Sequence, residues 1–176
     1  MEVYLIRHTA VDVPAGYAYG QTDVPLKATF PEEAACVKQS LEGHTFDQVW
    51  SSPLSRCRRL ATFCGYPEPM TDPRLMEVNF GEWEMKSWDD VSSDPRSVAW
   101  FADWLNQPTP GGESFSDQYR RVSAFLEDLR QSAYQKVLLF AHGGVLTAAR
   151  VYAGEYPIED AFKHLSNYGE MIRIVL

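Results

Sequence analysis

Two arginines and two histidines stand just behind short apolar runs that are typical of buried strands. Arg7 and His8 follow the first run, which occupies residues 3–6. Arg56 comes shortly after a second run, and His142 directly follows a third. Arginine forks match the oxygens of a phosphate group, and imidazole is both a nucleophile and a proton carrier. The residue types and their placement favour phosphate-ester chemistry.

The order of the predicted elements indicates how these side chains meet. Strands alternate with helices along the chain, which predicts an α/β protein, a three-layer α/β/α sandwich with a mostly parallel central sheet. In such a sheet, ligands bind beyond the carboxyl ends of the strands. We therefore expect the arginines and histidines to share one edge of the sheet. Strands are predicted at residues 3–6, 46–50, 136–141 and 171–176, and helices at 29–43, 54–64 and 143–153.

The first predicted helix has clear start and stop signals. Thr29 is the expected N-cap, with Pro31 in the first turn. Glu32 stands in the capping-box position, and Gly43 is the expected terminator.

Length and composition limit the protein class. A chain of 176 residues with 45% hydrophobic and 23% charged residues fits one globular domain, residues 1–176. No apolar run approaches the roughly 18–20 residues that span a bilayer, so we expect no membrane partner. The N-terminus lacks a basic leader and a small-residue cleavage site, which predicts a cytoplasmic protein. A monomer and a homodimer both remain open.

Charge and cysteine content exclude several partners. The net charge of −8 disfavours nucleic-acid binding, so the expected partner is a small-molecule phosphate ester. The three cysteines include no CxxC pair, and no HExxH motif is present. We therefore predict neither a disulfide framework nor a metal site, and no cofactor.

Six motifs, in order along nearly the whole chain, resemble the histidine phosphatase superfamily, which also contains the phosphoglycerate mutases. Three carry the residues introduced above, and the other three match the G-x-x-D-x-P-L, E-x-x-F-G-x-W-E and G-G-E-S segments of that family. The motifs are Leu-Ile-Arg-His-Thr at 5–9, Gly-Gln-Thr-Asp-Val-Pro-Leu at 20–26, Ser-Pro-Leu-Ser-Arg at 52–56, Glu-Val-Asn-Phe-Gly-Glu-Trp-Glu at 77–84, Pro-Gly-Gly-Glu-Ser at 110–114 and Ala-His-Gly-Gly-Val at 141–145.

The resemblance implies a role for each matching residue. His8 corresponds to the nucleophile that forms a phosphohistidine, and Glu77 to the proton donor. Arg7, Arg56 and His142 correspond to the groups that bind the phosphate oxygens. From the residues alone, Glu77 is only one of several acids near Phe80 and Gly81. The full set of expected substrate contacts is Arg7, Thr9, Gly20, Gln21, Arg56, Glu77, Trp83, His142 and Gly143.

The chain also departs from the family pattern. Thr9 stands where a glycine is usual, and Phe30 replaces a glycine of the first helix. These changes affect substrate contacts in residues 9–30 and leave the expected nucleophile in place.

The segment of about residues 85–112 bears on the substrate. It holds Trp88, Trp100 and Trp104, and we expect either a lid of short helices over one end of the sheet or a helical layer of the core. Within the superfamily, the Asn-Phe-Gly-Glu-Trp-Glu-Met run at 79–85 followed by this segment resembles the phosphatases of α-ribazole 5′-phosphate in cobalamin synthesis, whose substrate carries a flat ring. Trp83, Trp88 and Phe115 are candidates for stacking on that ring, with a core role as the alternative. Other readings are a broad-specificity or sugar-phosphate phosphatase, a mutase, or a non-catalytic phosphate-binding module.

Overall fold

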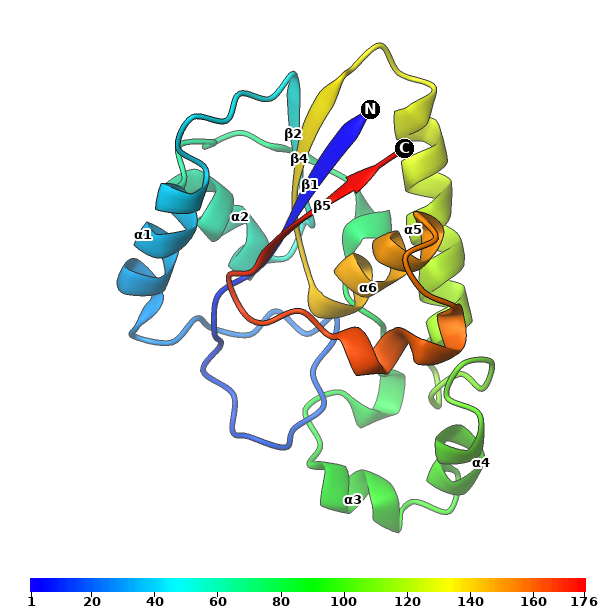
Figure 1. Cartoon of the computed structure of the whole chain (residues 1–176). Helices are drawn as coiled ribbons and strands as arrows, with labels where there is room; N and C mark the ends of the chain where they lie inside the picture. Colours follow the sequence, from blue (N-terminus) through cyan, green and yellow to red (C-terminus); the bar gives the residue numbers. More distant parts are fainter.

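The computed structural model describes all 176 residues and places a five-stranded sheet between two helical layers (Figure 1). The strand order is β3-β2-β4-β1-β5. Strands β1, β2, β3 and β4 run parallel, and β5 is antiparallel to β1, so the expected three-layer, mostly parallel architecture is confirmed. The strands are β1 (Glu2–Arg7), β2 (Gln48–Ser51), β3 (Met70–Thr71), β4 (Lys136–Ala141) and β5 (Met171–Val175).

The two faces of the sheet are covered by different helices (Figure 1). Val3 and Leu5 of β1 belong to the apolar core beneath two of the helices, and Tyr4 and Ile6 belong to the core on the other face. This alternation follows from the two-residue period of a strand, and it explains why the central strands are continuous apolar runs. The helices are α1 (Phe30–Ser40) and α2 (Ser55–Phe63) on one face and α5 (Phe115–Arg130) and α6 (Gly143–Tyr152) on the other.

Most predicted boundaries hold within a few residues, but the expected capping box of α1 is wrong. Thr29 is the N-cap, yet its side chain caps no backbone N–H. Its hydroxyl instead donates to Glu33 Oε1 at 2.6 Å, and Glu33 Oε2 accepts the Ala10 N–H at 2.8 Å. Glu33, and not Glu32, therefore ties the start of the helix to the loop after β1.

Three neighbouring strands deliver their carboxyl ends to the same place. Beyond β1, the His8 N–H donates to the Ala141 carbonyl at 3.0 Å. Beyond β2, the Ser52 N–H donates to the Phe140 carbonyl at 2.9 Å. The sheet hydrogen bonding thus continues one residue past the strands and sets His8, Ser52 and His142 side by side.

Residues 85–112 lie beyond these carboxyl ends, at the lower end of the molecule in Figure 1. They form the short helices α3 (Trp88–Ser93) and α4 (Ser97–Ala102), whose residues belong to neither core cluster of the sheet. The Trp88 and Trp100 rings stack at 5.8 Å with an interplanar angle of 18°. The two short helices thus share an aromatic cluster with Phe80 and Trp83, whereas Trp104 and Leu105 pack against the core beneath α5 and α6. None of the helices is long and apolar enough to cross a membrane.

Candidate active site

His8 occupies the centre of the site, directly after β1. Its Nδ1 lies 2.7 Å from the Thr9 carbonyl oxygen, and because a carbonyl only accepts, Nδ1 carries the ring hydrogen. Burial, the Arg56 charge and the Arg7 charge lower the pKa of His8 from 6.5 to about 3. The ring is therefore neutral near pH 7, with an unprotonated Nε2 available as a nucleophile.

Arg7 and Arg56 bring two positive charges without carboxylate partners. Neither forms a salt bridge, and the buried Nε of each has no hydrogen-bond acceptor in the protein. Arg56 is fully buried in the first turn of α2 and donates to the Thr22 carbonyl at 2.9 Å and the Gly20 carbonyl at 2.5 Å. Buried charges normally have a counter-ion, so this pair is suited to bind an anion.

His142 faces His8 across the site, with ring centroids 5.2 Å apart. Burial, Arg56 and His8 lower the pKa of His142 well below its usual value, so it too is neutral. Its Nε2 lies 2.8 Å from Ser52 Oγ, which also accepts the Leu54 N–H at 3.3 Å. When the Ser52 hydroxyl donates to Nε2, the ring hydrogen is on Nδ1, which can donate to an anion.

Glu77 is held at the edge of the site by three donors. Its Oε1 accepts from Gln118 Nε2 at 2.7 Å and from the Val78 N–H at 3.0 Å. Its Oε2 accepts the Gly144 N–H at 3.1 Å. A Cβ at Gly144 would lie 2.4 Å from Oε1, so glycine is needed for this approach. The carboxyl group thus has a fixed position at the opening where a leaving group would lie.

The loop of residues 20–22 is shaped by Glu84. The Glu84 carboxylate accepts the backbone N–H groups of all three loop residues at 2.9–3.2 Å, and the Thr22 hydroxyl at 2.6 Å. Burial by itself would raise the pKa of Glu84, but hydrogen bonds from Gly20, Thr22 and their neighbours lower it below the usual value. Because the carbonyls of this loop hold Arg56, Glu84 positions that arginine indirectly.

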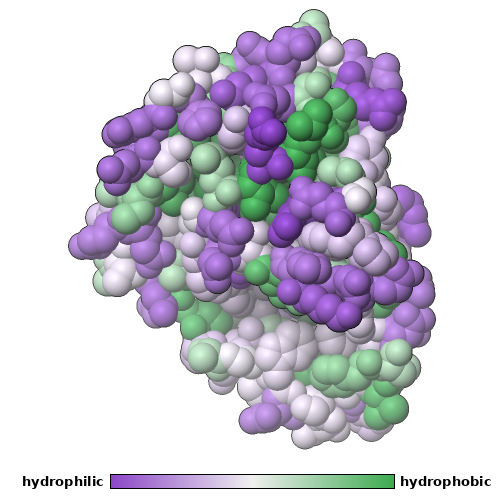
Figure 2. Space-filling view, viewed as in Figure 1, coloured by the Kyte–Doolittle hydropathy of each residue, from purple (hydrophilic) through white to green (hydrophobic).

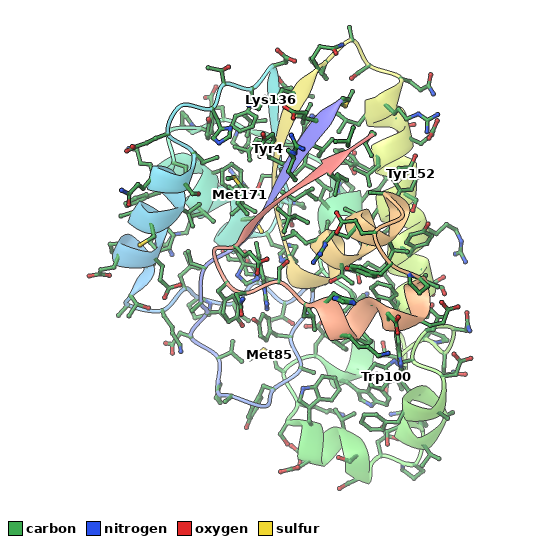
Figure 3. All side chains as sticks on the ribbon, in the orientation of Figure 1. Tyr4, Met85, Trp100, Lys136, Tyr152 and Met171 are labelled. Atoms are coloured by element: carbon green, nitrogen blue, oxygen red, sulfur yellow. The ribbon has the colours of Figure 1, made fainter.

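A cavity of about 470 Å³ opens from His8 toward residues 85–112, with 13 hydrophobic residues among the 20 that line it. Arg7, His8 and Glu77 lie at its polar end, and Arg7 is the only lysine or arginine in its wall. In Figure 2 the lower part of the molecule is mostly pale or green, and Figure 3 shows Trp100 there on α4. The aromatic wall consists of Tyr17, Tyr19, Phe80, Trp88, Trp100, Phe101, Trp104, Phe115, Phe162 and Tyr168.

Three of the expected substrate contacts are placed differently. Trp83 is fully buried, lies outside the cavity wall and donates from Nε1 to Asp94 Oδ2 at 3.0 Å, and its contact with the ligand stays a prediction. Gly20 and Gln21 belong to the loop that holds Arg56 and do not line the cavity either. A Cβ at Gly20 would lie 1.8 Å from the Val78 carbonyl oxygen, which explains the glycine.

The other expected residues either line the cavity or are buried behind its wall. Trp88 and Phe115 line the cavity, as expected for candidates to stack on a ring. Arg56, His142, Thr9 and Gly143 are buried and lie outside the cavity wall. No group of three or more His, Cys, Asp or Glu side chains is placed to share a metal ion.

Several residues that build the site were not predicted. Gln118 is separated from Glu77 by 41 positions, and Tyr168 from Tyr19 by 149, so no local spacing signals either contact. Ser52 and Glu84 lie within matched motifs, and that placement is the signal that could have singled them out.

Comparison with known proteins agrees with this geometry. Residues 3–175 match the family model described as the histidine phosphatase superfamily (branch 1). The adenosylcobalamin/alpha-ribazole phosphatase of Salmonella typhimurium is 32% identical over 155 residues, which cover 84% of this chain and 76% of that protein. The "Probable phosphoglycerate mutase GpmB" of Yersinia enterocolitica is 31% identical over 156 residues, covering 83% and 71% respectively. The crystal structure of the alpha-ribazole phosphatase from Shigella flexneri superposes with a TM-score of 0.90 at 28% identity, over 100% of this chain and 91% of that one. The chain belongs to the histidine phosphatase superfamily.

Proposed function

We propose that this chain is a phosphomonoesterase that transfers a phosphoryl group from a small-molecule ester to His8 and then to water. One observation carries the proposal. The neutral His8 ring, with its Nε2 free, lies beside the fully buried Arg56 and the half-buried Arg7, and neither arginine has a carboxylate partner. A nucleophile and a tetrahedral anion site are thereby placed next to each other.

The first chemical step forms the bond between His8 Nε2 and phosphorus and breaks the bond from phosphorus to the leaving oxygen. Arg7, Arg56 and the Nδ1 hydrogen of His142 bind the equatorial oxygens, where charge must be stabilised. Glu77 gives its proton to the leaving oxygen. The imidazole becomes positively charged on phosphorylation, and the Thr9 carbonyl stabilises it through the Nδ1–H bond.

In the second step, Glu77 takes a proton from water as the water oxygen attacks phosphorus. The Nε2–phosphorus bond breaks, His8 returns to its neutral form, and inorganic phosphate leaves.

The cavity favours α-ribazole 5′-phosphate as the substrate. Its flat benzimidazole can stack on Trp88, Trp100 or Phe115, which line the apolar wall. Two of the similar proteins described above are also named as alpha-ribazole phosphatases. A phosphoglycerate or a phosphoserine would bring a carboxylate into this wall, where Arg7 is already used for the phosphoryl group. The other charged groups in the wall, Glu77 and Glu113, are acids and would repel a carboxylate, and Arg121 lies outside the wall and is paired with Glu113 at 2.9 Å.

The alternative is a broad-specificity or sugar-phosphate phosphatase. It draws support from the open position of the phosphate site, which would serve any monoester. A substrate panel separates the two: α-ribazole 5′-phosphate, ribose 5-phosphate, 3-phosphoglycerate and phosphoserine, assayed with EDTA present. We expect kcat/KM for the ribazole ester to exceed that for ribose 5-phosphate by about tenfold or more, because burying one aromatic ring contributes about 1.5–3 kcal/mol.

Equal kcat/KM values across the panel would contradict the specific substrate and favour a broad-specificity phosphatase. Binding of inorganic phosphate without turnover of any ester would contradict the phosphatase proposal and favour the non-catalytic module.

A further inference from the structure

Two tyrosines from distant parts of the chain meet beside the phosphate site. The hydroxyl oxygens of Tyr19 and Tyr168 are 2.5 Å apart, and both residues line the cavity together with His8. The Tyr168 ring lies 4.1 Å from the Arg7 guanidinium carbon and 5.6 Å from the His8 ring centroid. The Tyr19 ring lies 5.6 Å from the Arg56 guanidinium carbon. The hydroxyl pair thus joins two rings, each of which faces one of the phosphate-binding arginines.

The backbone holds both tyrosines at this position. The Gly169 N–H donates to the Arg7 carbonyl at 3.1 Å, which fixes the loop of Tyr168 against the end of β1. The residue before Tyr19, Ala18, pairs with Met85 and Lys86 through backbone hydrogen bonds of 2.7 and 2.8 Å. In Figure 1 the two segments are the loop after β1 and the loop before β5, both at the carboxyl ends of the strands.

The two hydroxyl groups carry two hydrogens, and the hydrogen bond between them uses only one. Only one of the two hydrogens can lie between the oxygens, and neither hydroxyl has a second hydrogen-bond partner in the protein. Burial and then the bond to Tyr168 raise the pKa of Tyr19, so its hydroxyl stays protonated at neutral pH. One O–H donor therefore remains unused in the region where Arg7, Arg56 and His8 converge.

We propose that the Tyr19–Tyr168 pair is an additional phosphoryl-binding group, in which the hydrogen not used in the bridge is donated to a phosphoryl oxygen. The inference rests on the proposed phosphoryl site at His8. The two hydroxyls act in series: one donates to the other, and the second donates to the anion. Chains of this kind strengthen each bond in them.

The test removes the hydroxyls and keeps the rings. Tyr19→Phe, Tyr168→Phe and the double variant are compared with wild type. Tyr134→Phe is the matched control, because Tyr134 lies two residues before β4, at the opposite end of the sheet. Calorimetry gives the Kd of inorganic phosphate, and steady-state kinetics give kcat/KM for p-nitrophenyl phosphate. We expect the double variant to bind phosphate about tenfold more weakly or worse, as for loss of a hydrogen bond to a charged group, with a similar loss in kcat/KM.

An unchanged phosphate Kd in a folded double variant would overturn the inference, and so would a lower Tm with unchanged binding, which would make the pair a structural brace. Should the double variant not fold, a single Phe variant that loses phosphate affinity supports the inference, and two single variants with wild-type affinity overturn it. A wild-type protein that binds phosphate but turns over no ester would refute the proposed function alone, because the phosphate Kd of the variants is measured without turnover.

Discussion

His8 combines burial with a fixed ring orientation, and these two properties account for its reactivity. The Thr9 carbonyl holds the hydrogen on Nδ1, so the lone pair on Nε2 is exposed to the cavity. The neighbouring arginines keep the ring unprotonated. No separate base is needed to activate such a nucleophile, which distinguishes it from a serine or a threonine.

The lowered pKa of His8 has a consequence for stability against acid. In the unfolded chain the ring binds a proton below about pH 6.5, whereas in the folded protein it stays neutral down to about pH 3. The unfolded state therefore binds more protons in this window, and the free energy of unfolding decreases as the pH falls from 6.5 toward 3.

We expect His8→Asn to lose less unfolding free energy than wild type between pH 7 and pH 4.5, because asparagine cannot be protonated. Urea unfolding at the two pH values measures the difference. His142 is present in both proteins, and burial and Arg56, the two largest causes of its lowered pKa, are the same in both. The same pH dependence in both proteins would show that His8 is not kept neutral by its surroundings.

Glu77 is the expected acid, and its role can be separated from simple binding by varying the leaving group. Glu77→Gln should slow hydrolysis of an alkyl ester such as ribose 5-phosphate by about 10²–10⁴-fold, the usual contribution of general acid catalysis. p-Nitrophenyl phosphate should be affected far less in the first step, since nitrophenolate leaves without a proton. Stopped-flow kinetics should show that the variant still releases a rapid first equivalent of nitrophenol.

Arg56→Ala serves as the comparison, because loss of an oxygen-binding charge should slow both esters alike. Equal slowing of the burst phase for both leaving groups in Glu77→Gln would assign Glu77 to binding. The acid would then have to be sought at Glu113, the other acid in the cavity wall.

At the residue scale, sequence motifs predicted the groups of the proposed phosphate site better than the groups that support them. His8, His142 and Arg56 could be predicted because each follows a strand closely. Gln118 could not, because it is one polar residue on α5 whose contact with Glu77 depends on how the helix packs. Trp83 was expected at the ligand because tryptophan suits stacking, but its complete burial places it in the support of Trp100.

At the scale of elements, the loop of residues 20–22 connects two distant parts of the site. Its N–H groups are bound by Glu84, and its carbonyls accept from Arg56. Arg56 lies on α2, whereas Glu84 follows a turn of residues 81–83. The orientation of the guanidinium thus depends on a carboxylate that does not touch it.

Glu84→Gln should therefore weaken phosphate binding and also lower the free energy of unfolding. An amide cannot accept all the hydrogen bonds that the carboxylate accepts, and we expect a loss of about 2 kcal/mol or more in unfolding free energy. We also expect kcat/KM to fall by about tenfold, since Arg56 loses its fixed position. Glu82→Gln is the matched control, because Glu82 is exposed and its carboxylate pairs only with Arg96. A lower free energy of unfolding with unchanged kcat/KM would show that Glu84 stabilises the fold but does not position Arg56 for catalysis.

The sequence predicted short helices within residues 85–112 but not their bounds. Their length did not decide whether they cover an end of the sheet or form a layer of the core. Each spans six residues, too few for a clear apolar period. The aromatic residues give them a common core, which the structure shows at the end of the sheet. That these helices move as a lid remains a prediction.

Trp100→Ala tests whether this element contributes to substrate choice. We expect KM for α-ribazole 5′-phosphate to rise by about tenfold, because an aromatic wall of the cavity is lost. KM for ribose 5-phosphate should change little. Val98→Ala, on the same helix and 71% exposed, is the control. Equal changes in KM for the two esters would show that α4 does not recognise the ring.

At the scale of the whole molecule, charge distribution matters more than net charge. The chain carries −8 overall, yet the edge of the sheet holds two arginines without carboxylate partners. The order β2-β4-β1 brings together residues that are up to 135 positions apart in sequence, such as Arg7 and His142. The fold class could be predicted from alternating apolar runs, since a buried parallel sheet requires them. The contacts that orient the side chains could not, because they depend on packing between distant segments.

In the proposed reaction, the phosphoryl group passes through His8. Rapid chemical quench during turnover of ³²P-labelled ester, followed by peptide mapping at alkaline pH, measures this most directly. We expect label on the peptide that contains His8, bound by an acid-labile linkage that forms and decays as fast as turnover. His8→Ala should remain folded, carry no label and have no activity. Turnover without label on His8, or label that persists in His8→Ala, would contradict the account.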